Sequence, residues 1–163
     1  YFKTMWKIKD KILTGKEKKI IEHCFGSRLD LLNIQWIYRS KKYYQLSAAD
    51  IYTLLIPVRY KLRAEQIRQM AEADSPEEFF AALRMTAYGK IQETEWGSQP
   101  DVEQLYHQIL NRIYSNAGRR NPYTIAVLDS YLYAKEQEIQ RIIATIEGIR
   151  YQLPPEEIIG RQC

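Results

Sequence analysis

The sequence is poor in the residues that interrupt or cross-link regular structure. Seven glycines and six prolines occur among 163 residues, and nearly all of them fall between periodic segments. Most of the chain is therefore available for long regular elements. Two cysteines, Cys24 and Cys163, are too few to organise the fold by disulfides, and they favour a reducing compartment such as the cytoplasm.

Long apolar runs are also missing. No stretch approaches the roughly 20 apolar residues that a membrane helix needs. The longest nearly uncharged segment near the middle of the chain, Leu46–Val58, is interrupted by Ser47, Asp50 and Pro57. We expect a soluble protein with no transmembrane segment of its own. The first residues, Tyr1–Trp6, include no initiator Met and no signal-peptide pattern. They are typical of the interior of an amphipathic helix, so we expect an N-terminal portion to precede them.

The positive and negative charges of the chain are nearly balanced. Lys and Arg number 24 against 20 Asp and Glu, for a net charge of +4. This excess is too small and too dispersed to indicate nucleic-acid binding, and the densest run, Lys16–Lys19, is interrupted by Glu17. A mild positive charge helps docking to an acidic partner. With 45% hydrophobic and 27% charged residues, the composition is that of a globular domain.

Side-chain patterns that carry catalysis or bind metals are absent from the sequence. His23 and Cys24 are adjacent and point in different directions on a helix, His107 has no second ligand at i+4, and no zinc spacing exists. There is no glycine-rich phosphate loop and no nucleophile elbow. The pairs Glu77-Glu78 and Glu156-Glu157 are typical of first helical turns. We therefore expect no catalytic, cofactor-binding or metal site and no cofactor.

Helical periodicity is what the sequence does contain. The clearest helix is 101–117, where Pro100 suits the first turn and Gly118 suits the end. Its apolar residues recur at the spacing of a single helical stripe: Val102, Leu105, Tyr106, Ile109, Leu110, Ile113 and Tyr114.

A second long helix is predicted to open at Asn121-Pro122, a cap followed by proline, and to run to about Gly148. Because only three residues separate it from 101–117, the two helices should pack antiparallel. One side of it carries a set of aliphatic residues: Leu128, Leu132, Ile139, Ile142, Ile143 and Ile146.

The remaining segments also have helical patterns. Ser75-Pro76 with Glu78 marks one start, and Ser47 with Asp50 marks a helix through about Ile56, ended by Pro57. No strand alternation persists between turns. The prediction is an all-α helical bundle of eight or nine helices. Three more helices are expected at the N-terminal end, separated by Gly15 and Gly26: 2–13, 16–25 and 28–44.

Two stretches of the chain resemble each other. One runs from Asp30 through Tyr44-Gln45-Leu46, and the other runs from Glu138 through Tyr151-Gln152-Leu153, with one residue gapped. In each, an acid opens the last turns of a helix, a basic loop follows, and Tyr-Gln-Leu leads into a short helix. This indicates a helix–loop–helix unit used twice. We assign 1–60 to part of a preceding helical pseudo-repeat and 61–163 to the last one.

These residues carry a family resemblance. Asp30-x-x-Asn33-Ile34 with Arg39-x-Lys41, and Lys135-Glu136-x-Glu138-Ile139 with Arg150-Tyr151, resemble motifs in the C-terminal portion of the C subunit of V-type and A-type rotary ATPases (the d subunit in eukaryotes). The resemblance covers nearly the whole chain, in the right order. Further matching segments are Ile56-Pro57, Thr86-x-Tyr88, Ile146-Glu147-Gly148 and Leu153-x-Pro155-Glu156-Glu157-Ile158.

The resemblance implies a non-enzymatic role. Family members are cups of three pseudo-equivalent helical domains, which sit on the membrane proteolipid ring and receive the lower end of the rotor shaft. The implied function is that of a central-stalk subunit that joins shaft to ring in ATP-driven proton or sodium transport or in ATP synthesis. The implied location is peripheral, at the cytoplasmic face of a membrane. The implied partners are the shaft subunits and the ring, with no nucleic acid.

Departures from the family pattern keep alternatives open. Arg141-Ile142-Ile143 replaces the usual Asn-Ile-Arg order, and Gln45 and Gln152 stand where a small residue or glycine is usual. One alternative is a helical scaffold of the same fold that binds other proteins outside the ATPase. Another is a weak RNA-binding module that uses basic residues, namely Lys41, Lys42, Arg119 and Arg120.

Eight residues are candidates for partner contact or for packing between pseudo-repeats. For Asp30 and Asn33, we favour a partly buried polar pair that fixes the next pseudo-repeat, over direct contact with the shaft. For the two loops of mixed cations and tyrosines, 40–44 and 149–151, structural packing is favoured over binding. The full candidate set is Asp30, Asn33, Arg39, Lys41, Glu138, Arg141, Arg150 and Tyr151.

Overall fold

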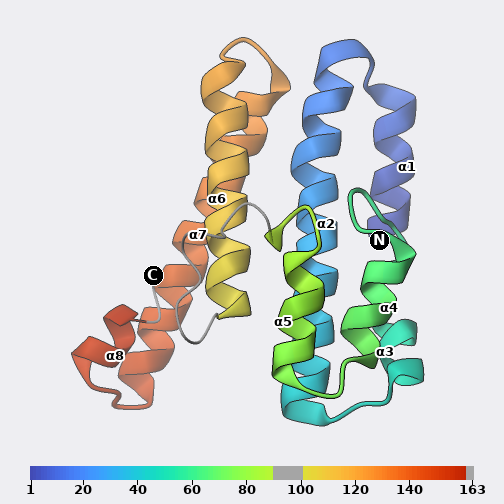
Figure 1. The fold of residues 1–163 in the computed structure, drawn as a ribbon. Coiled ribbons are helices and arrows are strands. Elements are labelled where there is room, and N and C mark those ends of the chain that lie inside the picture. The colour runs from blue at the N-terminus through green and yellow to red at the C-terminus, as the bar shows by residue number, and fades with distance from the viewer. Residues whose placement is uncertain (90–100, 161–163) are drawn as a thin grey trace. The chain divides into compact units, whose positions relative to one another are not determined.

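A computed structural model describes residues 1–89 and 101–160, and these residues are almost entirely helical (Figure 1). No strand occurs among them, which confirms the predicted all-α class. The helices in chain order are α1 (Phe2–Ile12), α2 (Gly15–Tyr44), α3 (Ala48–Leu54), α4 (Ala64–Glu72), α5 (Pro76–Arg84), α6 (Val102–Arg120), α7 (Ile125–Arg150) and α8 (Pro155–Gly160).

The chain divides into two compact units, unit 1 (Tyr1–Ile113) and unit 2 (Tyr114–Cys163). This division describes compactness in space, whereas the boundary at 60/61 describes the sequence repeat. The assignment of the pseudo-repeats therefore stays a prediction.

The predicted break at Gly26 is wrong, because α2 runs without interruption from Gly15 to Tyr44. Gly26 lies inside the helix at a close contact: a Cβ there would stand 2.6 Å from Cγ and 2.8 Å from Cβ of Tyr60. The glycine therefore makes room for a tyrosine from a distant segment and does not end a helix. A 30-residue helix is about 45 Å long.

Gly118 was also expected to end a helix, and it too lies inside one. α6 continues to Arg120, and a Cβ on Gly118 would lie 2.7 Å from Oγ of Ser130 on α7. Tyr114 stacks on Tyr133 with ring centroids 4.2 Å apart. Because earlier residues of α6 meet later residues of α7, the two helices run antiparallel, as predicted. Pro100, assigned to the first turn of this helix, lies outside the described residues.

α7 begins later than predicted. Its N-cap is Thr124, whose Oγ1 accepts a hydrogen bond from the Ala126 N–H at 3.3 Å. Asn121 instead completes the preceding helix, since its Nδ2 donates to the Ala117 carbonyl at 2.9 Å. The cap-like pair Asn121-Pro122 therefore ends α6 and does not start α7. α7 then passes through Gly148 and ends at Arg150.

Two predicted starts are confirmed and one helix was not anticipated. Ser47 and Ser75 each accept a hydrogen bond from the backbone N–H three residues on, at 3.2 Å. α3 ends at Leu54, two residues short of the prediction. α4 was missed, although it starts where the Arg63 N–H donates to Gln66 at 3.0 Å.

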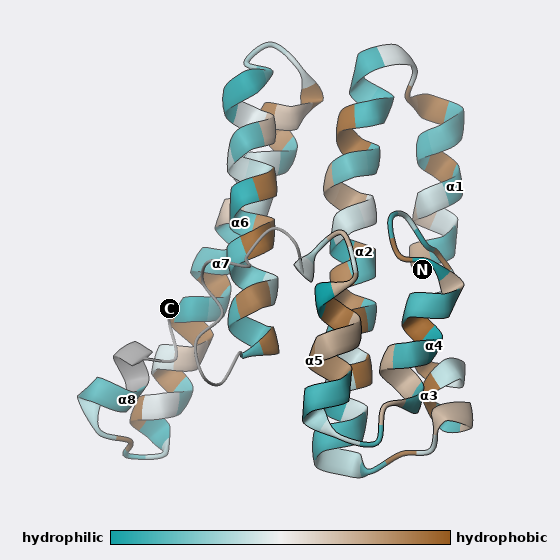
Figure 2. Cartoon of the chain, in the orientation of Figure 1, coloured by the Kyte–Doolittle hydropathy of each residue, from teal (hydrophilic) through white to brown (hydrophobic). Residues whose placement is uncertain are grey.

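The core of unit 1 lies where α2 meets α3 and α4, and α5 packs on α4 and places the Phe79 ring against Tyr38 of α2. Figure 2 shows hydrophobic residues recurring among hydrophilic ones along α2, α4 and α5. α1 is held to α2 by a buried amine: Nζ of Lys9 lies 2.6 Å from Glu22 and 4.0 Å from the centre of the Trp6 ring. Fully buried side chains of this core include Leu29, Leu31, Ile34, Ile37, Ile51, Met70 and Leu83.

Candidate functional site

Two polar side chains one turn apart on α2 form what we call the α2 clamp. Asp30 is fully buried, and its carboxylate accepts hydrogen bonds from three consecutive backbone N–H groups. The donors are Tyr60 at 3.0 Å, Lys61 at 2.6 Å and Leu62 at 3.1 Å. Such charge-assisted bonds compensate a carboxylate for the loss of water. Asp30 therefore fixes the backbone of residues 60–62 against the middle of α2.

A tyrosine hydroxyl completes the environment of Asp30. Tyr88 is 1% exposed, and its hydroxyl donates to Oδ2 of Asp30 at 2.8 Å. Burial, followed by the neighbouring negative charge of Asp30, raises the pKa of Tyr88 above its usual range. The phenol therefore stays protonated and serves as a hydrogen-bond donor.

Asn33 is the second residue of the α2 clamp. Its side chain is 1% exposed and pairs twice with the backbone of Ile56. Nδ2 donates to the Ile56 carbonyl at 3.2 Å, and the Ile56 N–H donates to Oδ1 at 2.8 Å. Residues 56–62 are thus bound to α2 at both ends. Because both clamp side chains are enclosed, their positions favour packing within the chain over direct contact with a partner.

Arg39 and Lys41 lie near the C-terminal end of α2 and have partners in unit 1. Nε and Nη2 of Arg39 lie 2.8 and 2.7 Å from Oε1 of Glu103. Nζ of Lys41 donates to the Ala71 carbonyl at 2.7 Å, in the last turn of α4. A lysine at this place satisfies a carbonyl that the helix leaves free. Neither partner could be predicted from the local sequence, because the paired residues are 30 or more positions apart in the chain.

A pocket of about 470 Å³ lies beside Lys41. One wall is aromatic, with the Tyr38 and Phe79 rings 5.3 Å apart. Nζ of Lys42 lies 5.2 Å from the centres of the Tyr38 and Tyr43 rings, and a hydrogen bond with Tyr38 raises the pKa of Lys42. The other lining residues are Gln45, Leu46, Ala73, Asp74, Ser75 and Pro76. A pocket of this size is large enough for a small ligand or a partner side chain.

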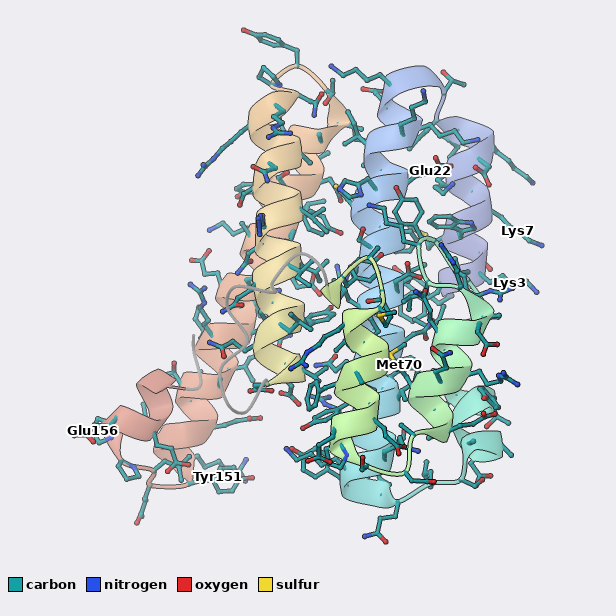
Figure 3. The ribbon with its side chains drawn as sticks, in the orientation of Figure 1. Lys3, Lys7, Glu22, Met70, Tyr151 and Glu156 are labelled. Atoms are coloured by element: carbon teal, nitrogen blue, oxygen red, sulfur yellow. The ribbon has the colours of Figure 1, made fainter. Side chains whose placement is uncertain are left out.

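The four candidates in the second repeat copy are less enclosed. Glu138 pairs with Lys135 at 2.6 Å, with both side chains about half exposed. Arg141 and Arg150 are exposed on α7, and Tyr151, 70% exposed, follows it at the turn into α8 (Figure 3). The structure therefore gives Asp30 and Asn33 a shared buried environment, but it gives none to Glu138 and Arg141 at the matching positions.

The two repeat copies share an unusual backbone conformation. Gln45 and Gln152 are the only non-glycine residues with positive φ in the described parts of the chain, at 49° and 54°. Each follows a long helix, and each precedes a leucine whose N–H returns to that helix: Leu46 to the Ser40 carbonyl at 3.2 Å, and Leu153 to Gly148 at 3.0 Å. Left-handed residues at helix ends are usually glycine. The left-handed glutamine is common to the two copies, and the repeat itself stays a prediction.

Neither a metal centre nor a membrane span occurs in residues 1–89 and 101–160. No group of three or more His, Cys, Asp or Glu side chains there could hold a metal ion. None of the helices in this range combines the length and the apolar character needed to cross a bilayer.

The chain matches one protein family. The family model described as "ATP synthase (C/AC39) subunit" matches residues 1–161. Similar curated proteins are named as the C subunits of A-type ATP synthases. The one from Methanothermobacter thermautotrophicus is 25% identical over 147 residues, covering 86% of this chain and 38% of that protein. The one from Pyrococcus horikoshii is 29% identical over 150 residues, covering 88% and 40%.

A third relative with the same name, from Pyrococcus furiosus, is 27% identical over 154 residues, covering 90% of this chain and 41% of the relative. The chain therefore spans about two fifths of the length of the curated relatives it matches. No solved structure gave a significant match.

Proposed function

We propose a role in a rotary ATPase for this chain, which belongs to the ATP synthase (C/AC39) subunit family. The proposed role is that of a non-catalytic central-stalk subunit that couples the rotor shaft to the membrane proteolipid ring. The ring would move protons or sodium ions, driven by ATP hydrolysis or driving ATP synthesis. The subunit would lie peripherally at the cytoplasmic face of the membrane. The observation that carries the proposal is the family match over residues 1–161.

The physical properties of unit 1 suit the transmission of torque. α2 is a continuous helix of 30 residues, and the α2 clamp attaches a distant segment to its middle by buried hydrogen bonds. A rotating coupler must not slip between its own elements. Buried charge-assisted bonds with several donors resist such sliding, because breaking them leaves a carboxylate unsatisfied in the interior.

We assign the candidate residues to two roles. Asp30 and Asn33 hold the packing of the pseudo-repeats, since both are enclosed. Lys41 lines the pocket at the end of α2 and binds the end of α4. Arg39 holds α2 to α6 through Glu103, and Glu138 forms an ion pair with Lys135 on α7. The partner-contact role goes to exposed residues on α7 and just after it, namely Arg141, Arg150 and Tyr151.

The test is capture of the full-length protein from its own membranes, with the partners identified by mass spectrometry. We expect proteolipid, shaft and catalytic-head subunits. Recovery of none of them, under conditions that keep the ATPase assembled, would contradict the stalk role and leave a helical scaffold of the same fold.

Charge variants separate partner contact from internal pairing. Arg141→Glu should reduce the recovery of ATPase subunits, whereas Gln140→Glu, the neighbouring exposed position, should leave it unchanged. For Arg39, reversal to Glu combined with Glu103→Arg should restore whatever Arg39→Glu alone removes. If the double variant stays defective, Arg39 acts on a partner and the internal role is wrong.

A further inference from the structure

The pocket at the end of α2 is formed by two segments of unit 1 that lie far apart in the sequence. The last two turns of α2 contribute Tyr38, Lys41 and Lys42. Gln45, in the left-handed conformation at φ 49°, then turns the chain, and the residue after it also lines the space. Residues 73–76, which join α4 to α5, supply the opposite segment. The space therefore exists only because the tertiary structure brings these segments together.

One part of the pocket is apolar and aromatic. Phe79 and Ala73 line it and are only 2% and 5% exposed, so both are packed firmly inside unit 1. The Tyr38 ring, which also lines the pocket, lies 5.3 Å from the Phe79 ring. The volume of about 470 Å³ is within the range of sites that enclose small organic molecules. An aromatic ring suits this part, because aromatic rings attract one another through their faces and edges.

Two lysine ammonium groups at the pocket form no ion pair with a carboxylate of the described residues. Nζ of Lys41 donates to the Ala71 carbonyl at 2.7 Å, and a carbonyl carries no net charge. Nζ of Lys42 lies 5.2 Å from the centres of the Tyr38 and Tyr43 rings. The hydrogen bond with Tyr38 raises the pKa of Lys42, so this ammonium keeps its charge at neutral pH. An anion that enters the pocket meets two positive charges that no acid neutralises.

Asp74 is the one acidic residue among those that line the pocket. Its side chain is exposed, and its backbone N–H donates to Glu78 at 2.9 Å. With two lysines and one aspartate, the lining has a positive net charge. A cationic ligand is therefore disfavoured, and an anionic ligand is favoured although Asp74 repels it. Removal of the Asp74 charge should increase the affinity for an anion.

We propose that this pocket binds a small organic anion, namely a carboxylate attached to an aromatic ring. The ring packs against Tyr38 and Phe79, and the carboxylate lies at the ammonium groups of Lys41 and Lys42. A neutral aromatic molecule would use only the first of these two parts. The proposal goes beyond the stalk role and does not depend on it, because it concerns a cavity within unit 1.

The first experiment compares two probes of nearly equal shape, 3-phenylpropionate and its uncharged amide, 3-phenylpropionamide. Saturation-transfer NMR with the purified full-length protein measures the affinity of each probe by titration. We expect the carboxylate to bind about 3- to 10-fold more tightly than the amide, because two partly solvated lysines attract only the charged probe. The difference should shrink at high salt, since exposed charges are screened.

Charge variants locate the carboxylate. Lys42→Gln should lower the affinity for 3-phenylpropionate about threefold and leave the amide unchanged. Asp74→Asn should raise the affinity for 3-phenylpropionate by a similar factor, and misfolding cannot produce such a gain. The matched control is Lys3→Gln, which removes the same charge from an exposed lysine on α1 that does not line the pocket (Figure 3). It should change neither affinity.

A ring variant locates the aromatic part of the probe. Tyr38→Leu keeps an apolar side chain on α2 but removes one of the two rings, so both probes should bind more weakly by the same factor. Circular dichroism of each variant shows whether the helices remain.

Three results overturn the proposal. Equal affinities of the two probes for the native protein would mean that the lysines do not bind the carboxylate. An equal loss in Lys3→Gln and Lys42→Gln would mean that the charge of the whole chain attracts the anion, without a site. No binding of either probe at about 10 mM, where even a weak site is occupied, would mean that the pocket is covered in the full-length protein.

Discussion

α2 and α7 are the two long helices of the predicted repeat. Each is followed by a glutamine with positive φ, but the two helices are covered differently. Leu31 and Ile34 on α2 are each 1% exposed, whereas Ile139 and Ile142, the matching residues of α7, are 54% and 52% exposed. Both copies keep the aliphatic positions. In unit 1, α4 packs on α2, whereas the element that follows α7 in the described residues is the short α8.

The polar residues at matching positions differ in burial in the same way: those on α2 are buried and those on α7 are exposed. Asp30 and Asn33 bind residues 56–62, whereas Glu138 pairs only with a half-exposed lysine and Arg141 is exposed. The same sequence pattern therefore occurs with a covered helix in one place and an exposed helix in the other, so contacts from other segments decide whether the middle of the helix is buried.

The largest expected effect comes from removing the acid of the α2 clamp. Asp30→Ala leaves three backbone N–H groups and the Tyr88 hydroxyl without this acceptor. We expect a loss of about 3–5 kcal/mol in the free energy of unfolding. Denaturant unfolding followed by tryptophan fluorescence measures it, since Trp6 and Trp36 both lie in unit 1.

The matched variant is Glu138→Ala, at the same position of the second copy. It removes only an ion pair with half-exposed partners, so we expect a change within about 0.5 kcal/mol. Similar losses in the two variants would mean that the two copies are packed alike, contrary to the structure.

Gly26→Ala should have the next largest effect. The new Cβ would lie only 2.6 Å from Cγ of Tyr60. The backbone of Tyr60 cannot shift freely, because its N–H donates a hydrogen bond to Asp30. We expect a net loss of about 1–3 kcal/mol despite the better helix propensity of alanine. The control is the double variant Gly26→Ala with Tyr60→Gly, in which the space is reopened. If Gly26→Ala alone stabilises the chain, the glycine serves no packing role.

The left-handed glutamines give a smaller effect of opposite sign. Gln45→Gly and Gln152→Gly relieve a backbone conformation that costs non-glycine residues about 1–2 kcal/mol, partly offset by the flexibility of glycine in the unfolded chain. We expect each to stabilise its own helix end by up to about 1 kcal/mol, measured by hydrogen exchange of the adjoining turns. Gln140→Gly, within α7, should destabilise by a similar amount. Opposite signs at positions 45 and 152 would contradict their equivalence.

The smallest effect is a pH dependence confined to unit 1. Burial, and then the nearby Lys61 charge, lowers the pKa of His23 below its usual 6.5. The unfolded chain therefore binds a proton more readily than the folded one. The contribution to stability should be complete above about pH 6.5 and should be lost as the pH falls from there through the folded pKa. Unfolding of His23→Gln compared with the native chain at about pH 5 to 7.5 measures this. An equal loss in both would assign the effect to other groups.

Local sequence was sufficient for the all-α class and for the serine-capped starts of α3 and α5. These features depend on interactions within a few residues, where capping, turn conformation and periodicity act. The family was likewise predicted from the order of the motifs, and the match over residues 1–161 confirms it. The loops expected at 40–44 and 149–151 are wrong, because residues 40–44 and 149–150 are the last turns of α2 and α7.

Other features depended on residues brought from far along the chain. Gly26 and Gly118 looked like helix ends but are places where another side chain approaches closely. The aliphatic side of α7 is exposed, because burial requires a covering element that periodicity does not supply. Asp30 could be recognised as a polar residue on an apolar helix, yet its three backbone donors lie 30 to 32 residues away. Such contacts are chosen by packing in three dimensions, since backbone N–H groups are the same at every residue except proline and only their position makes them partners.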